Sequence, residues 1–421
     1  MKTWLTYIAA AAMGLAFEFT FKDSTVLMTG MNFMANLVMR MGIFIVFPLV
    51  LATMASGTAS LSRKRGDTSF VWLSSIFWAM FTSAILSVAA ALMFRLLPAA
   101  FPATSTIPST AEQADAIYQT LSTSTTSRLS AANPFSINAF LNLFKSSDCL
   151  LPIAVLALVL GYALRPTSEI IRPAYITLNS FSEAMFRLAK TVARFMWIGI
   201  FFISGMWFQT IREDGSLASA WKFVILVCAI SFGMILVVIP FVFALFTGFR
   251  RNPYRQIKRL FSAATAAFFS NNYMFAQCAL YTDCRINLGI QKKVVATALP
   301  VHSLITKGGS ALVSTMCTCS IIYAINGALP TTIQTITIAL ACTLASFICC
   351  LHAGYEVVFV TTFALSLLNI KLSGAEFAIF GVLPLVNGIA LLFDVVLAGL
   401  GTGFTACHLK ADCLVRSRDN V

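Results

Sequence analysis

The sequence predicts an all-α polytopic membrane protein, and three observations carry that prediction. The chain has 421 residues, of which 58% are hydrophobic and only 11% charged, and its mean hydropathy is +0.85. Uncharged apolar runs of about 17 residues or longer recur along the chain, and that is the length a helix needs to cross a bilayer. These runs do not alternate between apolar and polar residues as barrel strands do, so helices are the expected spanning elements.

The first part of the chain contains successive long apolar segments. They are residues 4–21, 28–61, 69–97, 134–165, 171–211 and 221–248. The first follows Lys2 and resembles a signal peptide, but it has no clear small-residue cleavage site and further spans follow. We therefore interpret it as the first transmembrane helix. The Ser/Thr/Ala-rich segment 99–130 carries few charges and is expected to lie in an external loop.

The last third of the chain is less regular. Residues 253–290 and 330–367 are apolar segments interrupted near their middles, at 270–272 and 352–354. Such interrupted segments predict two re-entrant hairpins that build a substrate site at mid-membrane depth. Between them, the run 294–325 is broken by Thr306, Lys307, Gly308 and Gly309. An unwound helix is tolerable there only if its backbone lines a cavity.

Basic residues account for a net charge of +13, but they lie in short loops between apolar runs and form no single face or tail. This distribution argues against nucleic-acid binding. The positive-inside rule makes these loops cytoplasmic, and it places the loops with Lys22, Arg212 and Lys371 outside. The cytoplasmic set is Arg63, Lys64, Arg65, Arg165, Arg172, Arg250, Arg251, Arg255, Lys258, Arg259, Lys292 and Lys293. We expect a multi-pass protein of a bacterial inner (plasma) membrane, with both termini, including Arg416 and Arg418, in the cytoplasm.

Other kinds of chemistry find little support in the sequence. Several of the 11 cysteines lie inside apolar runs, where they are interpreted as small packing residues. The chain has no G-x-S-x-G, H-E-x-x-H or phosphate-binding loop, so we expect neither an enzyme nor a bound cofactor or resident metal. Whether sodium or protons couple to the function stays open.

Three groups of short sequences resemble one known family in their order and spacing. They are Phe-Pro-Leu-Val at 47–50 with Ser-Gly-Thr-Ala-Ser-Leu at 56–61, Asn-Leu-Gly-Ile at 287–290 with Leu-Pro-Val at 299–301, and Gly-Ser-Ala-Leu at 309–312. Over nearly the whole chain this pattern resembles the dicarboxylate/amino acid:cation symporters, the family of the glutamate and neutral amino acid transporters.

The resemblance implies eight transmembrane helices and two re-entrant hairpins in a homotrimer that works by an elevator mechanism. It implies scaffold helices 1 and 2 in residues 1–67, and helices 4 and 5 in residues 134–213. Helix 3 (68–98) and the segment 214–411, with helix 6, both hairpins and helices 7 and 8, would form the transport domain. Residues 99–133 would be the external loop and 412–421 a cytoplasmic tail.

The motifs of the family's first hairpin and of its seventh helix are both altered in this chain. Where the first hairpin of the family carries a serine run, this chain has Asn272, Tyr273 and Met274, although amide N–H groups at a hairpin tip can still bind an anionic group. The seventh helix of the family reads Asn-Met-Asp-Gly-Thr, with a carboxylate that binds sodium.

The matching positions in this chain are Thr306, Lys307, Gly308, Gly309 and Ser310. A carboxylate is absent and an ammonium group is present. Because sodium prefers oxygen ligands and a neighbouring ammonium repels it, Thr306, Lys307 and Gly308 are candidate residues for an altered coupling step.

The eighth helix admits two alignments. Matching Gly388 and Ile389 puts Asp394 on the amine-binding Asp of the family, Leu397 on its Arg, and Thr405 on its last, cation-binding Asp. A register three residues away puts Asp394 on the Arg. Both alignments remove the sodium ligands of this helix. In the first, Leu397 would exclude an acidic substrate side chain in favour of a neutral one.

Ionisable residues inside the spans suggest further roles. Lys307, Glu356 and Asp394 fall in the unwound helix, the second hairpin and the last helix, so Lys307 could replace a bound cation by pairing with one of the carboxylates. The alternative is a wet cavity in which these charges are merely solvated. His302 is interpreted as a packed, hydrogen-bonded core residue, and Glu18 as structural.

The function expected from these features is secondary active transport of small amino acids, with altered or absent sodium coupling. The candidate substrate residues are Asn272, Tyr273, Met274, Ser310, Glu356, Asp394 and Leu397, and the candidate coupling residues are Thr306, Lys307, Gly308 and Thr405. The expected partners are a small-molecule substrate, the lipid bilayer and two further copies of the chain. The alternatives are sodium-coupled dicarboxylate or glutamate symport, and a transport-inactive membrane sensor or scaffold.

Overall fold

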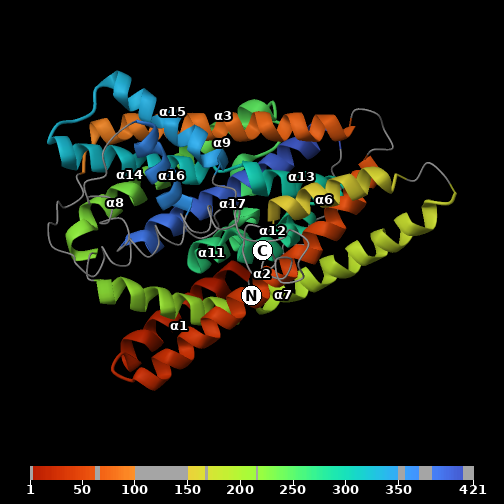
Figure 1. Cartoon of the computed structure of the whole chain (residues 1–421), viewed down its shortest axis with the longest axis horizontal. Helices are drawn as coiled ribbons and strands as arrows, with labels where there is room; N and C mark the ends of the chain where they lie inside the picture. Colours follow the sequence, from red (N-terminus) through yellow and green to blue (C-terminus); the bar gives the residue numbers. More distant parts are fainter. Residues whose placement is uncertain are drawn as a thin grey trace, which may run out of the picture.

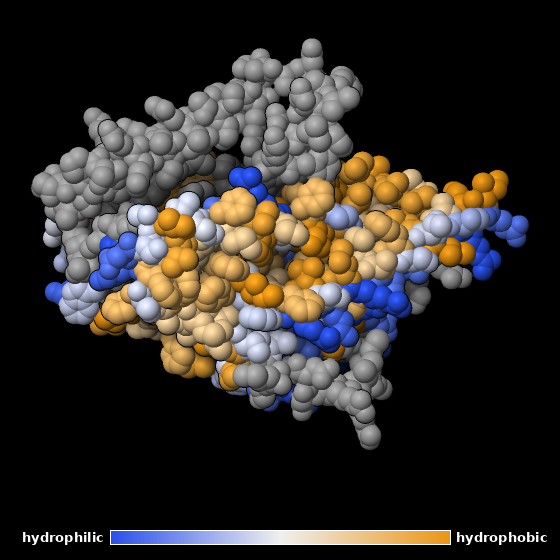
Figure 2. Space-filling view, turned by 90° about the horizontal axis from the view of Figure 1, so that it is seen from below, coloured by the Kyte–Doolittle hydropathy of each residue, from blue (hydrophilic) through white to orange (hydrophobic). Residues whose placement is uncertain are grey.

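The computed structural model describes residues 3–61, 67–99, 150–165, 169–214, 217–348, 356–368 and 382–410. Within these ranges the chain folds into α-helices and short π-helical turns with no β-strand, which confirms the all-α prediction (Figure 1). Seven helical segments of this part are long and apolar enough to cross a membrane. Figure 2 shows broad apolar areas beside hydrophilic stretches on the described part of one face, and exposed apolar side chains are expected where helices contact lipid.

Four helices from the first half of the chain form one packed group, most of which lies in the lower part of Figure 1. They are α1 (Thr3–Phe21), α2 (Thr25–Leu61), α6 (Leu150–Ala163) and α7 (Arg172–Asp214). The approach of α1 to α7 depends on Gly14, because a Cβ there would lie 2.3 Å from the carbonyl oxygen of Phe201. Close helix contact through small residues is the usual way for helices to associate in lipid.

The remaining long helices form a second group, in which two segments are interior. Its members are α3 (Asp67–Leu96), α8 (Leu217–Gly233), η2 (Met234–Val238), α9 (Ile239–Phe246), α13 (Lys292–Ile305), α14 (Gly308–Asn326) and α17 (Leu383–His408). The most apolar windows of α17 and of the α13–α14 segment are each 83% buried, against 28% for α1. Polar groups on α14 and α17 therefore face other parts of the protein.

The first predicted interruption is confirmed. Helix α10 (Pro253–Arg259) precedes a pair of short helices, α11 (Phe261–Ser270) and α12 (Tyr273–Thr282), and η3 (Asp283–Asn287) continues the second. Between α11 and α12, Asn271 has the left-handed φ of 49° and Asn272 is extended. The Asn272 side chain caps α12 by accepting from the amides of Met274 (2.9 Å) and Phe275 (3.2 Å).

The break in the seventh predicted span is shorter than expected. Only Thr306 and Lys307 leave helical geometry, whereas Gly308 and Gly309 open α14. The expectation that these glycines extend the unwound stretch was wrong. A Cβ at Gly309 would lie 2.1 Å from the carbonyl oxygen of Ala390, so this glycine permits contact between α14 and α17.

The second interrupted segment contains α15 (Thr332–Ile348) and α16 (Glu356–Leu367). The interruption at 352–354 lies outside the described residues. The same holds for the basic loop at 63–65, residues 100–149 of the expected external loop and fourth span, Lys371, and the tail with Arg416 and Arg418.

Candidate functional site

Asp394 of α17 binds the buried start of α14, where the predicted seventh span is broken. One carboxylate oxygen accepts from the amides of Gly309 (2.7 Å) and Ser310 (3.2 Å), and the other accepts from the Ser310 hydroxyl (2.6 Å). The first amides of a helix have no partner within the helix, and the positive end of its dipole favours an anion. Asp394 therefore satisfies the start of α14, and both of its oxygens are already engaged by the protein.

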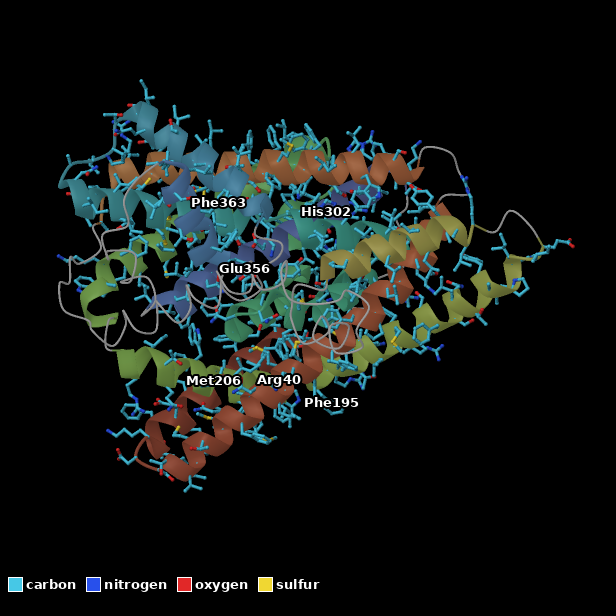
Figure 3. The ribbon with its side chains drawn as sticks, viewed as in Figure 1. Arg40, Phe195, Met206, His302, Glu356 and Phe363 are labelled. Atoms are coloured by element: carbon cyan, nitrogen blue, oxygen red, sulfur yellow. The ribbon has the colours of Figure 1, made fainter. Side chains whose placement is uncertain are left out.

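Lys307 lies between two carboxylates. Its ammonium nitrogen is 3.8 Å from an oxygen of Glu356 in α16 and 4.0 Å from an oxygen of Asp394. The ring centroid of Tyr273, from the tip of the first hairpin, is 4.5 Å from the same nitrogen, within cation–π range. Lys307, Glu356 and Asp394 are exposed by only 4%, 1% and 0%, and Glu356 lies in the middle of the molecule in Figure 3.

We call Lys307, Glu356, Asp394 and Tyr273 the lysine cluster. The ammonium of Lys307 lies within ion-pair distance of both carboxylates, whereas the sequence hypothesis pairs it with one of them. The formal charges of the two carboxylates and the one ammonium group in this cluster sum to one negative charge. No group of His, Cys, Asp or Glu in the described ranges is arranged to hold a metal ion.

A second polar cluster forms around His302. One ring nitrogen lies 3.1 Å from the Thr306 hydroxyl, and the other lies 3.1 Å from Ser75 and 3.3 Å from Thr405. His302 is fully buried, and a Cβ on Gly401 would approach its ring to 2.5 Å. The interpretation of a packed, hydrogen-bonded histidine is confirmed. Thr405, where the resemblance expects a cation-binding carboxylate, presents a hydroxyl to this ring.

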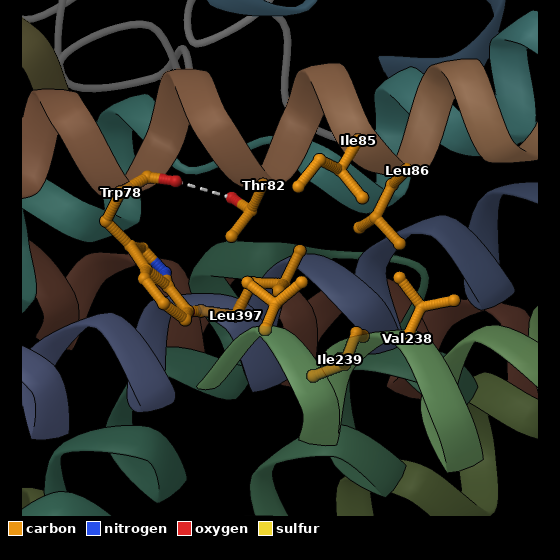
Figure 4. Close-up of a pocket in the computed structure, with 8 residues that line it drawn as sticks. Trp78, Thr82, Ile85, Leu86, Val238, Ile239 and Leu397 are labelled. Atoms are coloured by element: carbon orange, nitrogen blue, oxygen red, sulfur yellow. Dashed lines mark hydrogen bonds between the residues drawn. The ribbon is translucent and has the colours of Figure 1, made fainter. Parts of the chain in front are cut away.

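Leu397 lies in an apolar pocket between α3, α9 and α17 (Figure 4). The pocket includes Trp78, Leu86 and Ile239, and it has room for about 10 Å³. The indole nitrogen of Trp78 donates to the carbonyl oxygen of Leu397 at 3.0 Å. On the side of α14, Leu397 approaches Gly308, where a Cβ would be 2.7 Å from its methyl carbon. Leu397 therefore supplies bulk and no polar group.

At the first hairpin, the structure limits what the tip can offer a ligand. The amide of Met274 and that of Phe275 are bound by Asn272, so the expected backbone recognition is already satisfied within the hairpin at these two positions. The Met274 side chain is buried with 3% exposure. Tyr273 is the tip residue that reaches Lys307.

Sequence reasoning missed Asn387. Its side-chain oxygen accepts from the amide of Val357 in α16 (3.4 Å), and its nitrogen donates to the side chain of Asn271 (3.5 Å). Asn387 thus links both interrupted segments to α17. A lone amide inside the apolar run of the last helix is a signal that could have found it.

Comparison with known proteins gives a consistent result. The family model described as the sodium:dicarboxylate symporter family matches residues 3–397. The serine/threonine transporter SstT of Bifidobacterium adolescentis is 26% identical over 275 residues, which are 65% of this chain and 58% of that protein. The neutral amino acid transporter B(0) of Homo sapiens is 27% identical over 167 residues, or 39% of this chain and 30% of that protein. The matches thus span 58% or less of these two relatives.

Proposed function

Because the chain belongs to the sodium:dicarboxylate symporter family, a family of transporters and not of enzymes, we propose that it carries small neutral amino acids across the membrane. Two similar proteins are named as transporters of serine and threonine or of neutral amino acids, and these names support a neutral substrate. The absence of a guanidinium at Leu397 supports it further, since a buried leucine offers no partner for an acidic side chain.

The lysine cluster supplies the charge that an amino acid needs. Its described members leave one negative charge over, from Glu356 and Asp394 against Lys307. The amino group of a substrate bound next to both carboxylates neutralises that charge in a site with little water. Asp394 and Glu356 are the proposed amine-binding residues, with Ser310 and the hairpin residues Asn272, Tyr273 and Met274 around them.

The observation that carries the proposed mechanism is the buried ammonium of Lys307, 3.8 Å and 4.0 Å from two carboxylates. A sodium ion within about 4 Å of this ammonium would be repelled by roughly 4 kcal/mol at an effective dielectric near 20. The position of the last expected cation ligand, Thr405, faces a histidine ring. We infer that the ammonium group of Lys307 replaces a bound cation and that transport proceeds without sodium.

The larger arrangement follows the family resemblance. The helices α1, α2, α6 and α7 would form the scaffold of a homotrimer, and the second group with both hairpins would move as the transport domain in an elevator mechanism. Both termini would face the cytoplasm of a bacterial inner membrane. Native mass measurement should give three subunits, and a stable monomer would count against this arrangement.

Uptake into proteoliposomes tests the function. We expect saturable uptake of serine or alanine that persists when choline replaces sodium, with competition by neutral amino acids and none by glutamate or aspartate. Strict sodium dependence would refute the role of Lys307. Selective aspartate uptake would favour the dicarboxylate alternative, and no saturable uptake of any of these would favour a sensor or scaffold.

A further inference from the structure

A polar cavity lies away from the lysine cluster, between α2, α7 and the start of α13. Its volume is about 310 Å³. Its described lining contains two lysines and several neutral hydrogen-bonding residues, and no carboxylate; among them are Ser56, Tyr175, Asn179, Lys292 and Lys293. We call it the two-lysine cavity. A lining of this kind suits an anion and provides no carboxylate to pair with the amino group of a zwitterion.

Lys292 is held in place from the side of α7. Its ammonium nitrogen donates to the side-chain oxygen of Asn179 (2.9 Å) and lies 3.2 Å from Glu183. Glu183 is shared with Arg285, whose guanidinium is 2.9 Å away. The carboxylate of Glu183 is therefore paired with two cations, Lys292 and Arg285. The exposed Lys293 adds a third positive charge, and it forms no ion pair with the described residues. The local excess is two positive charges.

Asn179 is oriented by the same contacts. Its side-chain oxygen accepts from both Lys292 (2.9 Å) and Ser56 (3.2 Å), so its amide nitrogen is the end left to donate. Tyr175, one turn earlier on α7, also lines the cavity, and its side chain carries a hydroxyl donor. The cavity thus presents Lys293, the amide nitrogen of Asn179 and Tyr175 to one ligand, while the Lys292 ammonium, bound to Asn179 and Glu183, adds positive charge to the lining.

The start of α13 adds to the positive potential. The helix begins at Lys292 and its preceding residue, Gln291, provides no side-chain cap. Two lysines in the first turn oppose the helix dipole, which favours negative charge at that end. An anion in the two-lysine cavity removes this unfavourable arrangement. Basic pockets between transmembrane helices are also the usual binding places of acidic lipid headgroups.

We propose that the two-lysine cavity binds a phosphate group, presented by an anionic phospholipid headgroup or as a free phosphate ester. The site is independent of the substrate site in the proposed function. It joins α7 to α13, so an occupant would contact both groups of helices.

Binding can be measured on the purified full chain without a transport assay. Native mass spectrometry would count retained lipids with phosphatidylglycerol or phosphatidylcholine, and thermal unfolding would be followed with inorganic phosphate against chloride at equal ionic strength. We expect retention of phosphatidylglycerol over phosphatidylcholine, or stabilisation by phosphate alone. The first result identifies a lipid source and the second a free phosphate. The same retention of both lipids with no effect of phosphate would overturn the proposal.

Matched variants locate the site. Lys293→Gln removes an exposed charge from the cavity, and we expect about a fivefold loss of affinity for the anion that binds. Lys258→Gln makes the same change at an exposed lysine of α10 and should leave affinity unchanged. Asn179→Asp puts a carboxylate of the same shape into the lining and should weaken binding further. Equal affinity in Lys293→Gln and Lys258→Gln would refute the assignment.

Discussion

Replacing Lys307 with methionine tests the lysine cluster directly. At an effective dielectric near 20, an ammonium 3.8 Å and 4.0 Å from two carboxylates gains roughly 4 kcal/mol of Coulomb energy from each. Much of this offsets the cost of burying the three charges, but removing one partner of a buried ion pair leaves the others uncompensated and costs about 3–5 kcal/mol. We expect Lys307→Met to unfold at a markedly lower temperature in detergent.

Comparing sodium with choline in the medium shows whether the effect of Lys307→Met comes from the lost positive charge. In Lys307→Met, two buried carboxylates lack their positive partner, so sodium should raise the unfolding temperature above that in choline, while the unmodified protein should show no such difference. The double variant Lys307→Met/Glu356→Gln restores the charge balance and should recover most of the lost stability. An unchanged unfolding temperature for Lys307→Met, with no response to sodium, would show that the cluster is a hydrated vestibule.

Two further predictions concern α17. Gly401→Ala places a Cβ 2.5 Å from the ring of His302 and 2.6 Å from that of Trp78, so the free energy of unfolding should fall by about 1–3 kcal/mol, as measured by thermal unfolding. The control Gly233→Ala meets no atom within 4 Å and should leave the free energy of unfolding nearly unchanged. Asp394→Asn removes the charge that caps α14 and faces Lys307, so we expect loss of uptake and a stability loss of about 1–3 kcal/mol. Normal uptake by this variant would exclude Asp394 as the amine-binding residue.

The sequence by itself determined the helices and where two of them break. Hydrophobic length predicts the spans because a helix must cover the thickness of the hydrocarbon. The first interruption was visible because Asn271 tolerates the left-handed conformation and Asn272 can cap the helix that follows. Lys307 and Glu356 stood out because charges are rare at membrane depth. These signals are local, so neighbouring residues suffice to reveal them.

Only the tertiary structure decided which side chains meet. The sequence identifies Asp394 as a candidate residue, but it does not reveal that one carboxylate oxygen accepts from the amides of Gly309 and Ser310 and the other from the Ser310 hydroxyl, in a distant part of the chain. Gly309 reads as a helix breaker in the sequence, but the backbone of α17 lies so close that only a glycine fits there. The rotation of each helix against its neighbours sets such contacts, and a hydrophobic pattern that is nearly continuous around a buried helix carries no record of that rotation.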